Sequence, residues 1–121
     1  MAEEFNLKLV EILGKLNTFT GEKKYRKYAI FLESANKDSE RKNKFIDQYI
    51  INYFQFREEI YKRNVDFFVN KSIEGSTIIC DIISIRDVLE SLSKSNQEII
   101  IDLFIELTKI SERYLKTTYL S

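Results

Sequence analysis

The stretch that decides the fold runs from Ser95 to Lys116 and reads SNQEIIIDLFIELTKISERYLK. In a helix, its apolar residues would cover much of the circumference, and such a helix is normally surrounded by other elements rather than laid on one surface. These residues are Ile99, Ile100, Ile101, Leu103, Phe104, Ile105, Leu107 and Ile110. Ser95 and Glu98 have the spacing of a capping box, in which the two side chains satisfy backbone N–H groups at the start of a helix. The sequence therefore predicts a central helix over residues 95–116.

Composition limits the chemistry that the chain can perform. At 121 residues it is long enough for one domain with its own core, and we expect residues 1–121 to form a single domain. The 19 basic and 19 acidic residues cancel, which argues against a polybasic nucleic-acid binder. Cys80 is the single cysteine and histidine is absent, so an internal disulfide and the usual zinc and haem ligand sets are excluded. We expect no cofactor, no metal and no enzymatic activity.

The hydropathy pattern predicts a protein that does not enter a membrane. No stretch approaches the roughly 20 apolar residues that a membrane-spanning helix needs, because Asp102 and Glu106 interrupt the most apolar segment. Two glutamates follow Met1 and Ala2, whereas a secretory signal begins with positive charge. An intracellular location is expected.

Two amphipathic helices are predicted in the first third of the chain. The first covers residues 2–16, and Gly14 is expected to fray its end. The second should begin after Thr20, which is available as an N-cap, and end by Asn36. Its apolar stripe is made of Tyr25, Tyr28, Ala29, Leu32 and Ala35.

A third helix is expected after Asp38, which offers another N-cap. Its apolar spacing allows either one helix to about Lys62 or a kink within residues 52–56. Residues 64–70 are expected to form a short helical turn, and residues 71–76 a loop.

Residues 77–92 are ambiguous because their β-branched side chains would also suit a strand. Helix is preferred, since the apolar spacing stays helical and no other segment offers a partner strand. The residues with this spacing are Ile78, Ile82, Ile85, Leu89 and Leu92. The expected fold is all-α, a compact bundle of about five helices around the apolar C-terminal helix.

Residues 23–44 are a candidate interaction patch, with eight basic and three acidic residues, net +5. Its basic residues include Lys23, Lys24, Arg26, Lys27, Arg41, Lys42 and Lys44. Such a patch could contact phosphates, with Tyr25 and Tyr28 stacking on bases. Both tyrosines also belong to the predicted apolar stripe, so a solvated helix face beside a core face explains the same pattern.

Acidic residues suggest a second candidate surface. Glu98, Asp102 and Glu106 recur every four residues and would form an acidic ridge on the central helix. Carboxylate-rich metal sites in four-helix bundles need Glu-x-x-His motifs, which this chain cannot supply. The ridge is therefore expected either to face solvent and pair with Lys109 and Arg113, or to dock a partner. Two further features, the carboxylates Glu58, Glu59 and Asp66 and the thiol of Cys80, are expected to be non-catalytic, with Cys80 in the core.

Two segments carry a family resemblance: REEIYKRNVDFFVN at Arg57–Asn70 and LSKSNQEIIIDLFIEL at Leu92–Leu107. Their order resembles that in short all-helical proteins of unknown function encoded by large nucleocytoplasmic DNA viruses, which place an Asp-Phe-Phe turn before a loop and two apolar helices. The resemblance covers residues 45–115. It implies a viral origin and a helical bundle, and it brings no catalytic residues.

These observations favour a non-enzymatic protein-binding module, acting as a homodimer or as a virion or host-interaction component. The chain has no cofactor motif, and some of its seven tyrosines and nine phenylalanines would be available for an interface. The alternative is a nucleic-acid accessory protein that uses the basic patch at residues 23–44.

Overall fold

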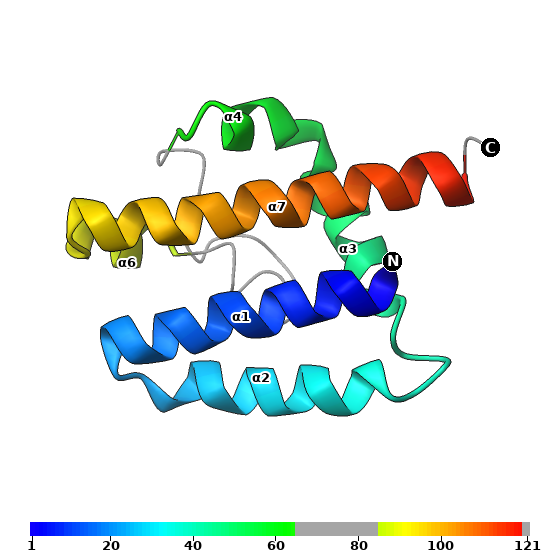
Figure 1. Ribbon diagram of the computed structural model, residues 1–121, viewed down its shortest axis with the longest axis horizontal. Helices are drawn as coiled ribbons and strands as arrows, with labels where there is room; N and C mark the ends of the chain where they lie inside the picture. Colours follow the sequence, from blue (N-terminus) through cyan, green and yellow to red (C-terminus); the bar gives the residue numbers. More distant parts are fainter. Residues whose placement is uncertain (65–84, 120–121) are drawn as a thin grey trace.

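The computed structural model describes residues 1–64 and 85–119, and all regular structure in these ranges is helical (Figure 1). The α-helices are α1 (Ala2–Thr20), α2 (Lys23–Asn36), α3 (Lys44–Tyr53), α4 (Arg57–Tyr61), α6 (Arg86–Ser91) and α7 (Lys94–Thr118). A 3₁₀-helix, η1 (Phe54–Phe56), joins α3 to α4. The prediction of an all-α fold is confirmed.

Helix α1 lies between α2 and α7, and α4 lies on the side of α7 that faces away from α1 (Figure 1). Helix α3 contacts both α1 and α7. As the outermost helix of the α7–α1–α2 layer, α2 buries one face on α1 and leaves the opposite face open. This placement makes α2 the natural place to look for an interaction surface.

The core lies where α1, α2, α3 and α7 meet. Phe5, Leu9 and Ile12 of α1 and Phe104 and Leu107 of α7 are fully buried. Their spacing of three or four residues puts each set on one helical face, which is why these segments pack as amphipathic helices. Burying such side chains contributes about 1.5–3 kcal/mol each.

Helix α7 occupies the central position that the sequence predicts and packs against α1, α3 and α4. It is not covered all round, however, because Glu98, Asp102 and Glu106 form an exposed polar strip along it. Ile99, beside this strip, keeps 37% of its surface exposed. The central helix is therefore enclosed on its apolar faces and open along one polar edge.

The predicted capping box at Ser95 is wrong, because the N-cap residue of α7 is Ser93, two residues earlier. Ser93 has extended backbone angles, and its Oγ accepts a hydrogen bond from the Asn96 N–H at 3.2 Å. The Gln97 side chain is also engaged there, donating to the Leu89 carbonyl of α6 at 3.0 Å. Ser93 is thus the N-cap residue where the chain leaves α6, and Ser95 lies within the first turn of α7.

The junction between α1 and α2 also differs from the prediction. Helix α1 passes through Gly14 and ends only at Thr20, where Gly21 adopts the left-handed conformation (φ 73°) and donates its N–H to the Asn17 carbonyl at 2.8 Å. Thr20 is therefore the last residue of α1, and its hydroxyl bonds back to the Leu16 carbonyl at 2.7 Å. Glu22 takes the N-cap position of α2, which ends at Asn36 as predicted.

Asp38 heads a turn and does not cap a helix. Its carboxylate accepts the Glu40 N–H at 2.8 Å, and α3 begins later, at Lys44. Of the two predictions for the third helical segment, the kink is confirmed, because η1 interrupts it at residues 54–56.

Residues 65–84 lie outside the described part of the chain, and so do most of the predicted turn at 64–70, the loop at 71–76, Asp66 and Cys80. Of the segment 77–92, the described residues include the helix α6, with Ile85 and Leu89 buried. The preference for helix over strand is confirmed over Arg86–Ser91, and Ile85 is the N-cap residue of this helix.

Candidate docking surface on the second helix

The predicted basic patch divides into paired and unpaired cations. Lys24 lies 3.4 Å from the Glu22 carboxylate, Arg41 lies 3.0 Å from Asp38, and Lys42 lies 2.8 Å from Glu3. Lys23, Arg26 and Lys27 form no ion pair with the described residues, and neither does Lys44 in the first turn of α3. Only part of the predicted patch therefore offers free charge.

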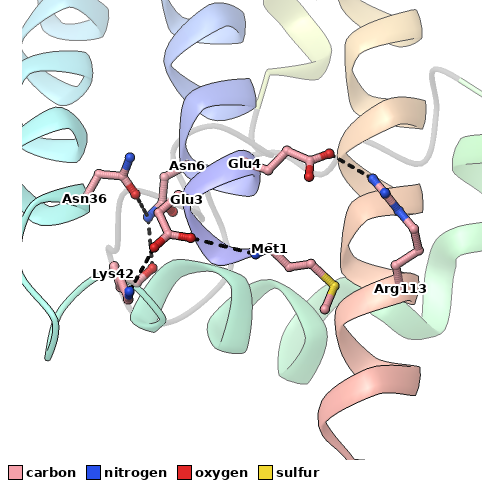
Figure 2. A network of polar contacts seen from close by, with 7 residues as sticks. All are labelled: Met1, Glu3, Glu4, Asn6, Asn36, Lys42 and Arg113. Atoms are coloured by element: carbon pink, nitrogen blue, oxygen red, sulfur yellow. Dashed lines mark hydrogen bonds and ion pairs between the residues drawn. The ribbon is translucent and has the colours of Figure 1, made fainter.

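Lys42 belongs to a structural network at the start of α1, shown in Figure 2. The buried Asn6 side chain donates one hydrogen bond to the Asn36 side chain at 3.1 Å and another to the Lys42 carbonyl at 2.8 Å. Glu3 accepts from the Lys42 ammonium, and this hydrogen bond lowers the pKa of the Glu3 carboxyl. Together these contacts attach the α2–α3 connection to α1, so we assign Lys42 to the fold.

The unpaired cations line an open groove near the α1–α2 junction. Lys23, Arg26 and Lys27 contribute from the beginning of α2, and Asn17 and Gly21 contribute from the end of α1. Ile30, one turn further along α2, completes the lining of the groove, whose volume is about 510 Å³. The spacing of the α2 residues, at i, i+3, i+4 and i+7, brings them to one side of the helix.

Two apolar side chains extend this region. Ile30 is 59% exposed and Phe31 is 47% exposed. Phe31 packs edge-on against Phe45 with ring centroids 6.2 Å apart, and the Arg41 guanidinium lies 5.9 Å from its centroid. We call the set Lys23, Arg26, Lys27, Ile30 and Phe31 the α2 surface.

The tyrosines of the predicted patch do not serve this surface. Tyr25 is 1% exposed and belongs to the core, and Tyr28 is half-buried against the core. The face that carries the tyrosines is thus the packing face of α2, as the second interpretation of the sequence expects. Tyr25 has no ring face free for a stacking base.

The acidic ridge is partly neutralised from neighbouring elements. Asp102 pairs with Arg63, which follows α4, and the Glu106 carboxylate lies 2.7 Å from the Lys8 ammonium of α1. The hydrogen bond to Glu106 raises the pKa of Lys8. The expected partner Arg113 instead binds Glu4 of α1 at 2.9 Å. Glu98 is exposed at the start of the ridge. The ridge therefore joins helices, which leaves little free acidic surface for docking.

Two of the three other carboxylates singled out in the sequence lie in the described ranges. Glu58 is exposed, and Glu59 accepts a hydrogen bond from Asn64 at 2.9 Å. Within residues 1–64 and 85–119, no three acidic or cysteine side chains are grouped closely enough to hold a metal ion. None of the helices in these ranges is long and apolar enough to cross a membrane.

The sequence prediction missed the apolar half of the α2 surface. Ile30 and Phe31 lie off the stripe made by Tyr25, Leu32 and Ala35, and on a helix this offset points them away from the core. The sequence did contain a signal for this exposed surface, because Ile30 and Phe31 are large apolar residues on an otherwise polar helix face.

Comparisons of the chain with models of protein families, with curated proteins and with solved structures find no match. The resemblance of residues 45–115 to helical proteins of large DNA viruses accordingly stays a prediction.

Proposed function

We propose that the protein is a non-enzymatic binding module whose α2 surface docks an acidic segment of another protein that carries an apolar side chain. The supporting observation is that three cations, which form no ion pair with the described residues, line one groove with the exposed Ile30, and that the exposed Phe31 follows Ile30 on α2. Apolar contact supplies affinity in such interfaces, and complementary charge supplies orientation and association rate.

A protein segment suits this surface better than a nucleic acid does. Ile30 presents an aliphatic side chain, which packs against apolar groups and makes no stacking platform for a base. Phe31 already has the Arg41 guanidinium near its ring, and Tyr25 is buried. Phosphate contacts by the three cations alone would give weak, salt-sensitive binding to nucleic acid.

A different protein suits the surface better than a second copy of the same chain. The acidic ridge, the obvious complement within this sequence, has Asp102 and Glu106 in ion pairs with Arg63 and Lys8. A dimer formed through the ridge would exchange these ion pairs for new ones, so it would gain little charge complementarity. The viral resemblance would make the partner a virion or host protein.

The proposal is tested with a synthetic peptide library in which acidic residues surround a fixed leucine. We expect binding that shifts the NMR amide signals of residues 23–31, and we expect Ile30→Ser to weaken it at least about tenfold. Ile51→Ser is the matched control, because Ile51 is 77% exposed on α3 and lies outside the α2 surface. Circular dichroism checks that both variants fold.

Three results would overturn the proposal. One is a library in which no member binds. Another is salt-sensitive binding of DNA oligonucleotides that Lys23→Glu combined with Arg26→Glu abolishes and Ile30→Ser leaves unchanged, which would establish the nucleic-acid alternative. The third is a dimer in light scattering that Ile30→Ser dissociates, which would make a second copy the occupant of the surface.

A further inference from the structure

We propose that the groove at the start of α2 binds a phosphate group on a serine or threonine of the docked segment, so that the module prefers a phosphorylated partner. This inference rests on the proposed docking function and names the chemical form of the partner. It concerns the groove residues Lys23, Arg26 and Lys27 together with Asn17 and Gly21.

The groove concentrates positive charge that forms no ion pair with the described residues. Lys23 is three residues from Arg26 and four from Lys27, and like charges at these spacings repel one another on a helix. The nearest acidic residue in sequence, Glu22, lies 3.4 Å from Lys24 and is already engaged by it. The groove therefore holds three positive charges whose repulsion a bound anion would relieve.

The three positive charges of the groove suit a phosphate group better than a single carboxylate. A single carboxylate carries one negative charge, whereas a phosphate monoester carries about −1.5 to −2 at pH 7 and offers three acceptor oxygens. An arginine fork binds two of these oxygens at once, and lysine ammonium groups supply further charge-assisted hydrogen bonds. One phosphate can thus engage several of the cations that line the groove.

The groove also leaves room for a phosphate group to approach its cations. Gly21 lines the groove, and among the described residues no heavy atom beyond Gly21 and its chain neighbours lies within 4 Å of the position that a Cβ would occupy there. Asn17 lines the groove from α1 and carries a side-chain amide, a further donor to a phosphate oxygen. A volume of about 510 Å³ is ample for a phosphorylated side chain.

The apolar part of the groove favours a phosphate carried by a protein over a free phosphate ion. Ile30 belongs to the same groove lining as the cations and is 59% exposed. A free ion would leave this apolar surface unused, whereas a phosphorylated peptide contacts the cations with its phosphate and Ile30 with a neighbouring apolar side chain.

The test compares paired peptides from the library that differ only in serine against phosphoserine. We expect the phosphorylated member to bind about tenfold or more tightly to the full chain, with the difference lost in Arg26→Gln combined with Lys27→Gln. Because Arg26 and Lys27 also belong to the α2 surface, this variant should bind both peptides more weakly, and it should bind the two equally. Lys15→Gln, which removes an exposed lysine of α1 outside the groove, should retain the preference.

A pH series adds a readout that a purely structural role of these residues would not change. The second pKa of a phosphate monoester is near 6, whereas lysine and arginine stay charged at that pH. We expect the preference for phosphoserine to shrink as the pH falls from about 7.5 to about 5.5. Inorganic phosphate alone should bind at least about tenfold more weakly than the phosphopeptide, because it lacks the apolar contact.

Each contrary result identifies what has failed. Equal binding of both peptides would overturn the phosphate site and leave the docking function standing. Inorganic phosphate binding as tightly as the phosphopeptide would also overturn the inference, by showing a site for free anions. Failure of every peptide to bind would overturn the docking function and this inference together.

Discussion

Tyr49 shows how one buried polar contact joins two helices of the core. Its hydroxyl lies 2.7 Å from Thr108 Oγ1, and Thr108 donates its own proton to the Phe104 carbonyl at 2.8 Å. Tyr49 must therefore be the donor. Thr108→Val keeps the shape of the side chain but removes this acceptor, leaving a buried hydroxyl unpaired. We expect the free energy of unfolding, measured by urea denaturation, to fall by about 1–3 kcal/mol.

Tyr49→Phe supplies the matched comparison. It removes the donor and leaves Thr108 bonded to the Phe104 carbonyl, so the expected loss is smaller, about 0.5–1.5 kcal/mol. The double variant should then be less destabilised than the sum of the two single variants, because neither partner is left unsatisfied. Additive losses would contradict the hydrogen bond between the two side chains.

Two glycines, Gly14 inside α1 and Gly21 just after it, allow the C-terminal end of this helix to be tested. Gly14 lies inside the helix with open space around it, so Gly14→Ala should stabilise the protein by about 0.5–1 kcal/mol. Gly21 also has open space but adopts φ 73°, so Gly21→Ala should destabilise by about 1 kcal/mol through backbone strain alone. Thermal unfolding of both variants measures the two shifts, and a shift of the same sign in both would contradict the observed end of α1.

The helix interiors could be predicted from sequence, but the N-cap residues of α2, α3 and α7 could not. Apolar spacing depends on one short window, and it correctly identified the buried faces of α1, α2 and α7. Capping depends on the backbone path of the connection, which tertiary packing sets. Thr20, Asp38 and Ser95 are all good N-cap residues by type, yet the structure uses Glu22, Asn43 and Ser93 in their place.

The candidate site also divides into residues that the sequence identified and residues that only the structure identified. Clustering in sequence was enough to single out Lys23, Arg26 and Lys27. Pairs such as Lys42 with Glu3 and Glu106 with Lys8 join residues far apart in the chain, so no local pattern could show that these charges are already used. Ile30 and Phe31 could be recognised as an exposed surface only once α2 was placed at the outside of the helical layer.

The molecule as a whole is stabilised mainly by its buried core. Ion pairs such as Lys8–Glu106 and Glu4–Arg113 lie at the surface, where each contributes about 0–1 kcal/mol and is screened by salt. The buried core instead includes aromatic hydroxyls whose ionisation would place charge in an apolar interior. Alkaline pH is therefore the condition that should test the intact fold most directly.

Burial raises the pKa of Tyr49 and Tyr114, and burial together with the nearby Glu112 raises the pKa of Tyr61 to about 12. In the unfolded chain, tyrosine loses its proton near pH 10. Between about pH 10 and 12 the unfolded state thus binds fewer protons than the native state, so the free energy of unfolding falls as the pH rises. Urea denaturation should show full tyrosine-dependent stability below pH 10 and a progressive loss above it.

Tyr49→Phe should make this loss shallower, because the phenylalanine has no proton to release. Tyr119→Phe is the control, since the Tyr119 side chain is 59% exposed. Absorbance at alkaline pH should also resolve tyrosines that titrate only as the protein unfolds. A native protein whose tyrosines all ionised together near pH 10, with no loss of helicity, would mean that water reaches Tyr49 and that α3 does not pack on α7 as the structure describes.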